Sequence, residues 1–321
     1  MAERRIGYHA SHEQHPPSDL LRFACAAADA GFEAAMCSDH FQPWSERQGH
    51  SGFAWAWLGA ALASTPMSFG TVTAPGQRYH PAVVAQGAAT LAELYPGRFW
   101  LALGSGEAMN ELVVGGAFPA KDERNARLRE CVDVIRALLR GETVTHRGLV
   151  TVEEARLWSL PDEPPPLIGA AITPETARWV GSWADGLITI ARSPEDMRRV
   201  VDAFREGGGE GKPMRLQAQL SWARTDAEAL ANAHDQWRTN IFDSPVLGEL
   251  RSPASFDAAA SFVRPEDVDG PVRVSSDVGR HVAWLEGDLE LGFERVYVHN
   301  VGRDQDSFIE TWGRDVLPRL G

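Results

Sequence analysis

Short apolar runs alternate with amphipathic stretches along almost the whole of the 321-residue chain. The apolar runs, of which 68–73 and 98–103 are examples, have the length of buried strands. Several amphipathic stretches begin as helices do: at 193–195 a capping serine precedes a proline and an acid. Strands that alternate with helices form a parallel sheet covered by helices. About eight such units predict a single closed (β/α)8 barrel of the TIM type over residues 1–321.

The length beyond an ordinary barrel of ~250 residues falls in two places. Residues 143–160, after the fourth strand, have the pattern of a β-rich excursion with a proline-rich exit. Residues 239–272, after the seventh strand, show weak periodicity and several prolines, which is typical of a lid or an inserted loop. A doubly wound sheet of two domains is the alternative, but no linker divides the chain.

The formal net charge of −13 argues against a nucleic-acid backbone or an anionic membrane as a partner. The first residues lack the apolar segment of a signal peptide, and no apolar run reaches the about 18 residues of a membrane span. The three cysteines are scattered, which is typical of a reducing compartment and argues against structural zinc or disulfides. We therefore expect a cytoplasmic protein that binds neither nucleic acid nor a membrane.

The stretch 37–44 places an acid and a histidine directly after an apolar run. The carboxyl ends of barrel strands point into the active site, so Asp39 and His40 are candidates for proton chemistry. Adjacent residues of a strand face opposite ways, so Asp39 cannot orient His40 as in a catalytic triad. We expect the two side chains to contact different groups, one the cofactor and the other the substrate. The structural alternative makes His40 a core histidine and Asp39 a helix cap. Trp44 either covers a ligand or packs on the barrel rim.

Glycines flank Ser105 directly after the fourth strand, which lets a flat or anionic ligand approach the backbone. Met109 stands where the dinucleotide-binding fingerprint needs its third glycine, so that fingerprint is absent. Glu107, just beyond the turn, is a candidate general acid. A tight turn without a ligand is the alternative for this segment.

The fifth strand ends in 171–174, where a threonine and a proline begin a helix. The free backbone N–H groups of that helix could hold a phosphate, although a plain capped helix has the same sequence. His9, His12 and His15 have a spacing that suggests metal, but rings on a strand end and loop do not converge as they do on a helix. We therefore predict no metal site.

Four blocks together carry a resemblance to a known family. They are 7–11 (GYHAS), 38–44 (SDHFQPW), 78–86 (RYHPAVVAQ) and 104–111 (GSGEAMNE). In order and spacing they resemble the luciferase-like oxidoreductases, and most of all the glucose-6-phosphate dehydrogenases that use the deazaflavin coenzyme F420. The likeness covers nearly the whole chain and is strongest over 5–140.

The resemblance implies a barrel that holds a flavin-like ring at the carboxyl ends of its strands. His40 would be the base that takes a hydroxyl proton, Glu107 would supply a proton to the reduced ring, and Trp44 would brace the reacting centre. A non-prolyl cis peptide behind the ring maps to the Thr71–Val72 bond. The residues that the resemblance implies and those at the strand ends described above together form the set of expected cofactor contacts. This set is Asp39, Thr71, Val72, Ser105, the backbone of Gly106, Asn110, Ala171, Ile172 and Thr173.

Two departures from the family bear on cofactor and substrate. The dehydrogenases have a Gly-Gly-Pro turn after strand five, where this chain has 172–174 (ITP), so side chains narrow the approach to the backbone. The only lysines, Lys121 and Lys212, do not fall where the family grips its sugar phosphate, and Arg192 or Arg273 are the candidate substitutes. A sibling branch is suspected of using ordinary flavin, so both F420 and FMN stay open as cofactors.

The function that we predict is hydride transfer between a small oxygenated substrate, a sugar or an alcohol, and F420 or FMN. One alternative is an FMNH₂-dependent monooxygenase served by a partner flavin reductase. A second alternative is a barrel that binds the ring without catalysis, as a sensor or carrier. The resemblance also implies a homodimer.

Overall fold

Eight parallel strands close into a barrel in the computed structural model, which describes residues 5–320. Neighbouring strands pair in the order of the chain, and β9 closes the ring by pairing with both β8 and β11. The predicted (β/α)8 barrel is confirmed, and the two-domain alternative is wrong. The barrel strands are β1 (Arg5–Ala10), β2 (Ala34–Ser38), β3 (Ser68–Thr73), β4 (Phe99–Leu103), β7 (Leu167–Ala170), β8 (Gly186–Ile190), β9 (Met214–Ser221) and β11 (Arg295–Asn300).

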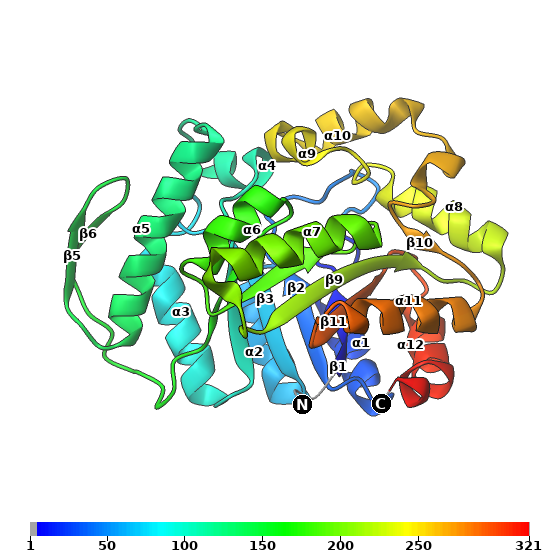
Figure 1. Ribbon diagram of the computed structural model, residues 1–321, viewed down its shortest axis with the longest axis horizontal. Coiled ribbons are helices and arrows are strands. Elements are labelled where there is room, and N and C mark those ends of the chain that lie inside the picture. Colours follow the sequence, from blue (N-terminus) through cyan, green and yellow to red (C-terminus); the bar gives the residue numbers. More distant parts are fainter. Residues whose placement is uncertain (1–4, 321) are drawn as a thin grey trace.

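Helices surround the strands, and the two chain ends lie on the same side of the barrel (Figure 1). Proline, a capping side chain or both mark the start of most of these helices, as the sequence patterns predicted. The helices are α1 (Pro17–Asp29), α2 (Ala54–Ser64), α3 (Pro81–Leu94), α4 (Ala108–Glu111), α5 (Lys121–Leu139), α6 (Pro174–Gly181), α7 (Pro194–Phe204), α8 (Asp226–Trp237), α9 (Ser244–Glu249), α10 (Pro253–Ala259), α11 (Val278–Glu290) and α12 (Gln305–Asp315).

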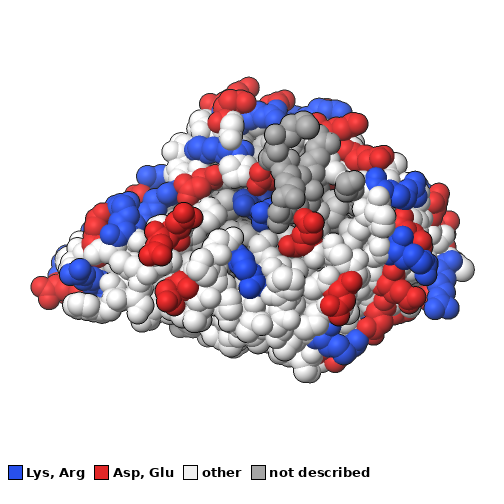
Figure 2. Space-filling model, turned by 90° about the horizontal axis from the view of Figure 1, so that it is seen from below, with Lys and Arg blue, Asp and Glu red and all other residues white. Residues whose placement is uncertain are grey.

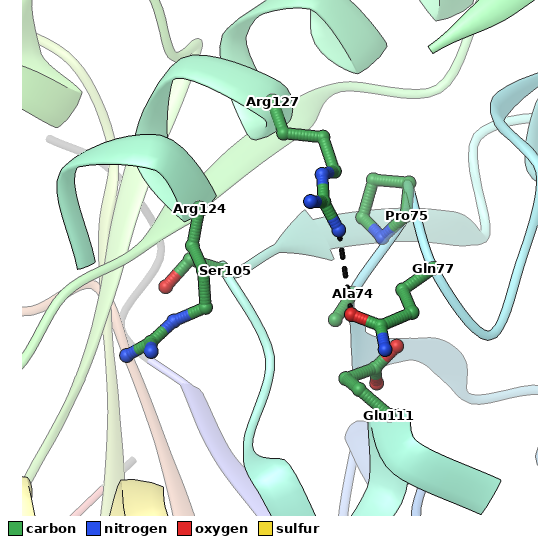
Figure 3. A pocket seen from close by; sticks show the side chains of 7 residues that line it. All are labelled: Ala74, Pro75, Gln77, Ser105, Glu111, Arg124 and Arg127. Carbon is green, nitrogen blue, oxygen red and sulfur yellow. Dashed lines mark hydrogen bonds between the residues drawn. The ribbon is translucent and has the colours of Figure 1, made fainter. Parts of the chain in front are cut away.

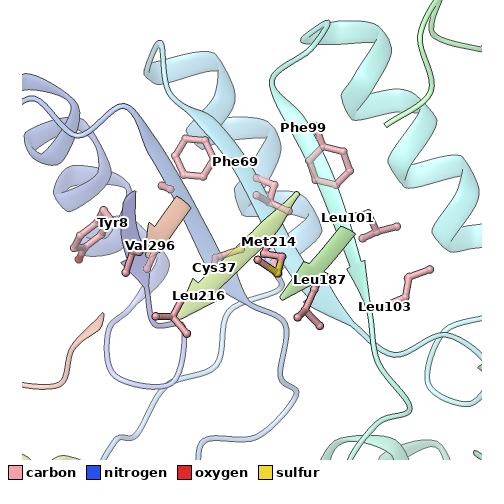
Figure 4. Packing of buried hydrophobic residues seen from close by; sticks show 14 of the residues in the cluster. Tyr8, Cys37, Phe69, Phe99, Leu101, Leu103, Leu187, Met214, Leu216 and Val296 are labelled. Carbon is pink, nitrogen blue, oxygen red and sulfur yellow. The ribbon is translucent and has the colours of Figure 1, made fainter. Parts of the chain in front are cut away.

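Alternate residues of most barrel strands pack in two separate apolar cores, which is why these strands read as continuous apolar runs. Phe69, Leu101 and Leu216 point out from the strands into the layer between barrel and helices (Figure 4). Trp100 and Tyr297 point inward and fill the barrel, with their ring centroids 5.4 Å apart. The inner residues therefore close the barrel below its carboxyl-terminal mouth.

Gly70 leaves the space that the Trp100 ring occupies, because a Cβ added to Gly70 would lie 1.9 Å from Trp100 Cε2. We expect Gly70→Ala to lower the free energy of unfolding by about 1–3 kcal/mol through overpacking. Gly59, on α2, is the control: an added Cβ meets nothing within 4 Å, and Gly59→Ala is expected to be neutral or to stabilise by up to about 1 kcal/mol. Chemical denaturation of both variants measures the difference, and equal midpoints would contradict the packing argument.

Both stretches predicted as insertions contain elements outside the barrel. Residues 143–160 contain β5 (Val144–Arg147) and β6 (Thr151–Ala155), which pair antiparallel. Residues 239–272 contain α9 and α10, followed by the two-residue strand β10 (Arg273–Val274) on the edge of β9. We call residues 244–259 the lid, because α9 and α10 lie at the end of the barrel away from the chain termini (Figure 1).

Acidic and basic side chains are interspersed on the face of the molecule that is seen from below the view of Figure 1 (Figure 2). No helix within residues 5–320 is long and apolar enough to cross a membrane.

Candidate active site

His40 stands at the barrel mouth and is held by a glutamate from another strand end. It follows β2, and its Nδ1 lies 2.5 Å from Oε1 of Glu13, which lies in the loop after β1. The Glu13 carboxylate is buried and also accepts hydrogen bonds from Ser11 Oγ at 2.7 Å and Ser38 Oγ at 2.8 Å. Glu13 therefore orients the imidazole and leaves its Nε2 toward the mouth.

The Glu13–His40 ion pair sets the charge of both groups. Burial disfavours the charged imidazole, but the neighbouring carboxylate outweighs burial and raises the pKa of His40 to about 9. Burial likewise opposes charge on Glu13, and the imidazolium together with the Ser11 hydroxyl brings the pKa of Glu13 below its ordinary value. At neutral pH the pair is therefore an imidazolium and a carboxylate.

Glu107 approaches His40 from the other side. It lies at the start of α4, just after β4, and its Oε2 is 3.7 Å from His40 Nε2. Burial raises the pKa of Glu107, against the opposing effects of the His40 charge and of the Asn110 Nδ2 hydrogen bond at 3.2 Å. A carboxyl group with a raised pKa next to an imidazole is suited to giving up a proton during a reaction.

Asn110 ties the tips of β2 and β4 together. Its Oδ1 accepts hydrogen bonds from the backbone N–H groups of Phe41 at 2.9 Å and Gln42 at 3.2 Å. The Gln42 side chain in turn donates to the Met109 carbonyl oxygen at 2.8 Å. The ends of β2 and β4, which the sequence analysis identified as candidate site positions, therefore lie side by side. These hydrogen bonds fix the distance between His40 and Glu107.

Asp39 faces away from His40, as the alternation of strand residues predicted. One carboxylate oxygen accepts from Thr73 Oγ1 at 2.6 Å, and the other from Tyr79 Oη at 3.0 Å and Arg78 Nη1 at 3.4 Å. Arg78 also donates its backbone N–H to Glu111 Oε2 at 2.9 Å. Asp39 thus belongs to a buried polar network that fixes the loop after β3.

Trp44 is buried beneath the lid, with 8% of its surface exposed. Its ring meets His40 edge-on at a centroid distance of 5.1 Å, and Phe256 of α10 meets it edge-on at 5.2 Å. Met109 is buried in the same cluster. Trp44 therefore packs between His40 and the lid, and its contact with a ligand stays a prediction.

Small residues line the mouth on the side of β3, β4 and β7. Ala74, Gly104 and Ala170 are half-buried there, next to the inward-facing Val72. Gly106 has φ +77°, and a Cβ at this position would lie 2.7 Å from Glu111 Cγ, so the turn requires glycine. These small residues leave space for a flat ligand next to His40 and Glu107.

A small polar pocket adjoins this surface between the loops after β3 and β4 and the helix α5 (Figure 3). Arg127 donates to the Gln77 side chain at 3.3 Å across it. Ser105, which also lines it, accepts a hydrogen bond from Lys121 Nζ at 2.7 Å. The pocket is lined by Ala74, Pro75, Gln77, Ser105, Glu111, Arg124 and Arg127.

The remaining residues predicted to contact a cofactor are buried or bound to other protein groups. Thr71 is fully buried and donates its hydroxyl to the Cys37 carbonyl oxygen at 3.0 Å. Thr173 caps α6 by accepting from Thr176 N–H at 3.3 Å, while Ala171 is buried and Ile172 half-buried in the same loop. Their contacts with a cofactor stay predictions.

The two arginines that could replace the family's phosphate-binding lysines differ in their exposure to solvent. Arg273, on β10, forms a bidentate ion pair with Asp288 at 2.5 and 2.7 Å. Arg192 is exposed in the loop after β8. Arg273 would have to leave a buried carboxylate to bind a substrate phosphate, which is costly.

The cis peptide predicted between Thr71 and Val72 is absent, since every peptide bond in residues 5–320 is trans. That prediction was wrong. Both residues belong to the regular ladder of β3, where Thr71 pairs with Cys37 of β2 and Val72 with Ser38.

His9 on β1 and His12 in the loop that follows it pack against different residues. His12 packs against Trp57, and the His9 ring lies 4.5 Å from the ring of His299 on β11. Burial lowers the pKa of His9 to about 4 and that of His299 well below its ordinary value, so both are neutral. Within the described chain, no group of three or more His, Cys, Asp or Glu residues could hold a metal ion.

Glu13 and His299 are the site residues that the sequence reasoning missed. Glu13 lies between His12 and His15, in a segment examined only for metal-ligand spacing. His299 is two residues beyond the inward-facing Tyr297 on the last strand, and this period of two could have placed it in the mouth.

Known proteins resemble this chain along nearly its whole length. The family model for luciferase-like monooxygenases matches residues 1–295. An F420-dependent glucose-6-phosphate dehydrogenase of Beutenbergia cavernae is 36% identical over 98% of this chain and 97% of its own length, and one of Mycobacterium avium is 35% identical over 100% and 99%. The solved structure of an F420-dependent secondary alcohol dehydrogenase in complex with an F420-acetone adduct has a TM-score of 0.93 at 30% identity and covers 99% of each chain. The chain therefore belongs to the luciferase-like monooxygenase family.

Proposed function

We propose that this protein is an F420-dependent dehydrogenase that oxidises a small alcohol-bearing substrate, with His40 as the base. The observation that carries the proposal is the position of His40, between Glu13 and Glu107 and beside a mouth surface of small residues. The relatives reported above act with F420 by name, whereas FMN is the alternative that the family's monooxygenases suggest. Oxidoreductase activity follows from the family membership.

The small-residue surface fits a planar tricyclic ring. The side chains of Val72, Ala74 and Ala170 and the Gly104 backbone would contact the ring, and the positive φ of Gly106 exposes its backbone at the edge of this surface. Bound F420 would supply a two-electron acceptor for hydride. We assign its tail to the loop 171–173, where the helix α6 begins.

The protein's own part in the reaction is the handling of protons. Glu13 holds His40 Nδ1, so Nε2 is the atom that takes the hydroxyl proton of the substrate. The Glu13 carboxylate stays ionised and stabilises the imidazolium that forms. Glu107, with its raised pKa, is the proton donor on the cofactor side, and Trp44 limits the position of the His40 ring.

Fluorescence titration of the protein with F420 and with FMN tests the cofactor assignment. We expect saturable quenching with F420 at micromolar concentration and at least tenfold weaker binding of FMN. A panel of alcohols and sugars should then bleach the visible absorbance of bound F420. Tighter binding of FMN, together with oxygen consumption by the FMNH₂ form, would instead support the monooxygenase served by a flavin reductase. F420 binding without reduction by any member of the panel would support a carrier.

The rate of alcohol oxidation should depend on pH through His40. Only the neutral imidazole can accept a proton, and its pKa in the free enzyme is raised to about 9. We therefore expect kcat/KM for alcohol oxidation to rise about tenfold per pH unit below that value and to level off above it. Reduction of the matching ketone needs the imidazolium and should stay level below about pH 9 and fall above it. A flat profile for alcohol oxidation between pH 6 and 9 would exclude His40 as the titrating group.

We further propose a homodimer in the cytoplasm, as the family resemblance implies. The three cysteines are free thiols, two of them buried, which is consistent with a reducing compartment. Light scattering on the purified protein measures the mass directly, and a monomer at micromolar concentration would contradict the dimer.

A further inference from the structure

We infer that Arg78 is a positioning residue for the proposed proton transfer, because it holds the peptide that carries His40 and places a positive charge among the carboxylates around the site. The inference rests on the proposed function, since it adds a residue to the same site. Arg78 lies in the loop between β3 and α3. Its hydrogen-bond and ion-pair partners are Asp39, Tyr79 and Glu111, so it acts on His40 through its neighbours.

The main chain around His40 is held by side chains from three other segments. Arg78 Nη2 donates to the Asp39 carbonyl oxygen at 2.6 Å, and Ser51 Oγ donates to the His40 carbonyl oxygen at 2.6 Å. Asn110 accepts from the next two backbone N–H groups, as described above. Of these three side chains only Arg78 is charged, and a charged donor makes the stronger hydrogen bond. Arg78 therefore holds the peptide bond that joins Asp39 to His40.

The guanidinium of Arg78 is itself fixed on several sides. The side chain is 7% exposed, and its Cζ lies 4.3 Å from the centroid of the Tyr79 ring. Nη1 donates to Tyr79 Oη at 3.1 Å and to the Asp39 carboxylate at 3.4 Å. The planar fork of arginine serves these partners together, which the point charge of a lysine cannot do. A side chain held in this way can fix the position of the His40 backbone.

Arg78 also places a buried positive charge between the ends of β2 and β4. Its Nη1 lies 3.4 Å from the Asp39 carboxylate, and its Nε lies 3.7 Å from Glu111 Oε1. Within residues 5–320, neither carboxylate has another ion-pair partner. Glu107 is at the start of the same short helix as Glu111, so the Arg78 charge acts on Glu107 as well.

The charge of Arg78 opposes that of Glu13 in setting the proton affinity of His40. Burial and the Arg78 charge lower the pKa of His40, whereas Glu13 and Glu107 raise it. At Glu107, burial raises the pKa, and the charges of His40 and Arg78 lower it. The other titratable groups that face His40 are His9 and His12, which are neutral because burial lowers the pKa of each to about 4. Removal of the Arg78 charge should therefore raise the pKa of both His40 and Glu107.

Arg78→Lys and Arg78→Gln separate the effect of position from that of charge. In both variants the high-pH plateau of kcat/KM for alcohol oxidation should fall by about 10–10²-fold, because the His40 backbone is no longer held by the guanidinium. Only Arg78→Gln should move the rising part of the pH profile to higher pH. This direction is opposite to the effect of removing the Glu13 carboxylate, which raises the pKa of His40.

NMR titration of histidine-labelled protein without F420 measures the charge effect directly. The His40 signal is the one that His40→Ala lacks, and it should titrate near pH 9 in the wild type. We expect a higher value in Arg78→Gln and an unchanged value in Arg78→Lys. An unchanged pKa of His40 in a folded Arg78→Gln protein would overturn the charge effect whatever the activity. Failure of the wild type to oxidise any compound with bound F420 would instead overturn the proposed function.

Arg98→Gln is the matched control. Arg98 directly precedes β4, at the opposite end of the barrel, and also donates to main-chain carbonyl oxygens, those of Leu62 and Met67, both at 2.9 Å. It also lies over an aromatic ring, that of Tyr95, at 5.6 Å. Its removal should lower the midpoint of chemical denaturation and leave the plateau, the pH profile and the His40 titration unchanged.

Two results would overturn the positioning role. One is a full wild-type plateau in a folded Arg78→Lys protein, and the other is an equal loss of rate in Arg98→Gln. If Arg78→Gln does not fold, Arg78→Lys decides, because it keeps the charge and loses only the geometry of the guanidinium.

Discussion

His40→Ala is expected to abolish alcohol oxidation while leaving the dissociation constant for F420 within a few-fold of wild type. His40 Nε2 is the atom positioned to take the substrate proton, and its neighbours Glu13 and Glu107 are the only carboxylates in ion-pair distance of the ring among the described residues. Loss of a general base costs about 10²–10⁴-fold in rate. Turnover is measured from the absorbance of F420 and affinity from its fluorescence.

His146→Ala is the matched control for this variant. His146 lies on β5, far from the mouth, and also contacts a glutamate, with its Nε2 at 2.9 Å from Glu130 Oε2. Its removal should leave turnover unchanged. Unchanged turnover in His40→Ala would remove His40 from the mechanism, whereas an equal loss in both variants would indicate a general effect on folding.

Glu13→Gln is expected to reduce the pH-independent limit of kcat/KM for alcohol oxidation, reached above the pKa of His40, by about 10²–10⁴-fold and to move the pH profile, because an uncharged amide neither stabilises the imidazolium nor fixes the ring as the carboxylate does. The Glu13 carboxylate is what raises the pKa of His40 against the effect of burial. Without it, the pKa of His40 falls, and the rise in kcat/KM for alcohol oxidation should move to lower pH. The pH dependence of kcat/KM in both variant and wild type measures the shift.

A second substitution separates this effect from a loss of structure. Glu130→Gln removes the carboxylate of the surface pair with His146 and should leave both rate and profile unchanged. If Glu13→Gln lost activity without any displacement of the profile, Glu13 would be a structural residue rather than the group that sets the charge of His40.

Much of the fold could be predicted from the sequence because local patterns specify it. The alternation of buried strands with capped helices predicts the barrel, and the carboxyl ends of its strands then identify where His40 and Glu107 lie. Alternation along β2 further predicts that Asp39 and His40 face opposite sides, and the separate hydrogen-bond partners of Asp39 agree.

The pairing of Glu13 with His40 could not be predicted in this way. The two residues follow different strands, and their contact depends on how the loops after β1 and β2 bend toward each other. The burial of Trp44 depends on Phe256, which lies in a segment with weak sequence periodicity. The Thr71–Val72 prediction was wrong because it came from family likeness alone, and no pattern in the residues themselves supported it.

Asn110 joins the β2 and β4 tips within the barrel, whereas the apolar covering of Trp44 comes from an insertion more than a hundred residues later in the chain. The residues proposed to handle protons and the segment that covers Trp44 are therefore far apart in the chain. We expect substitutions at the exposed positions of 244–259 to leave the distances from His40 to Glu13 and Glu107 unchanged.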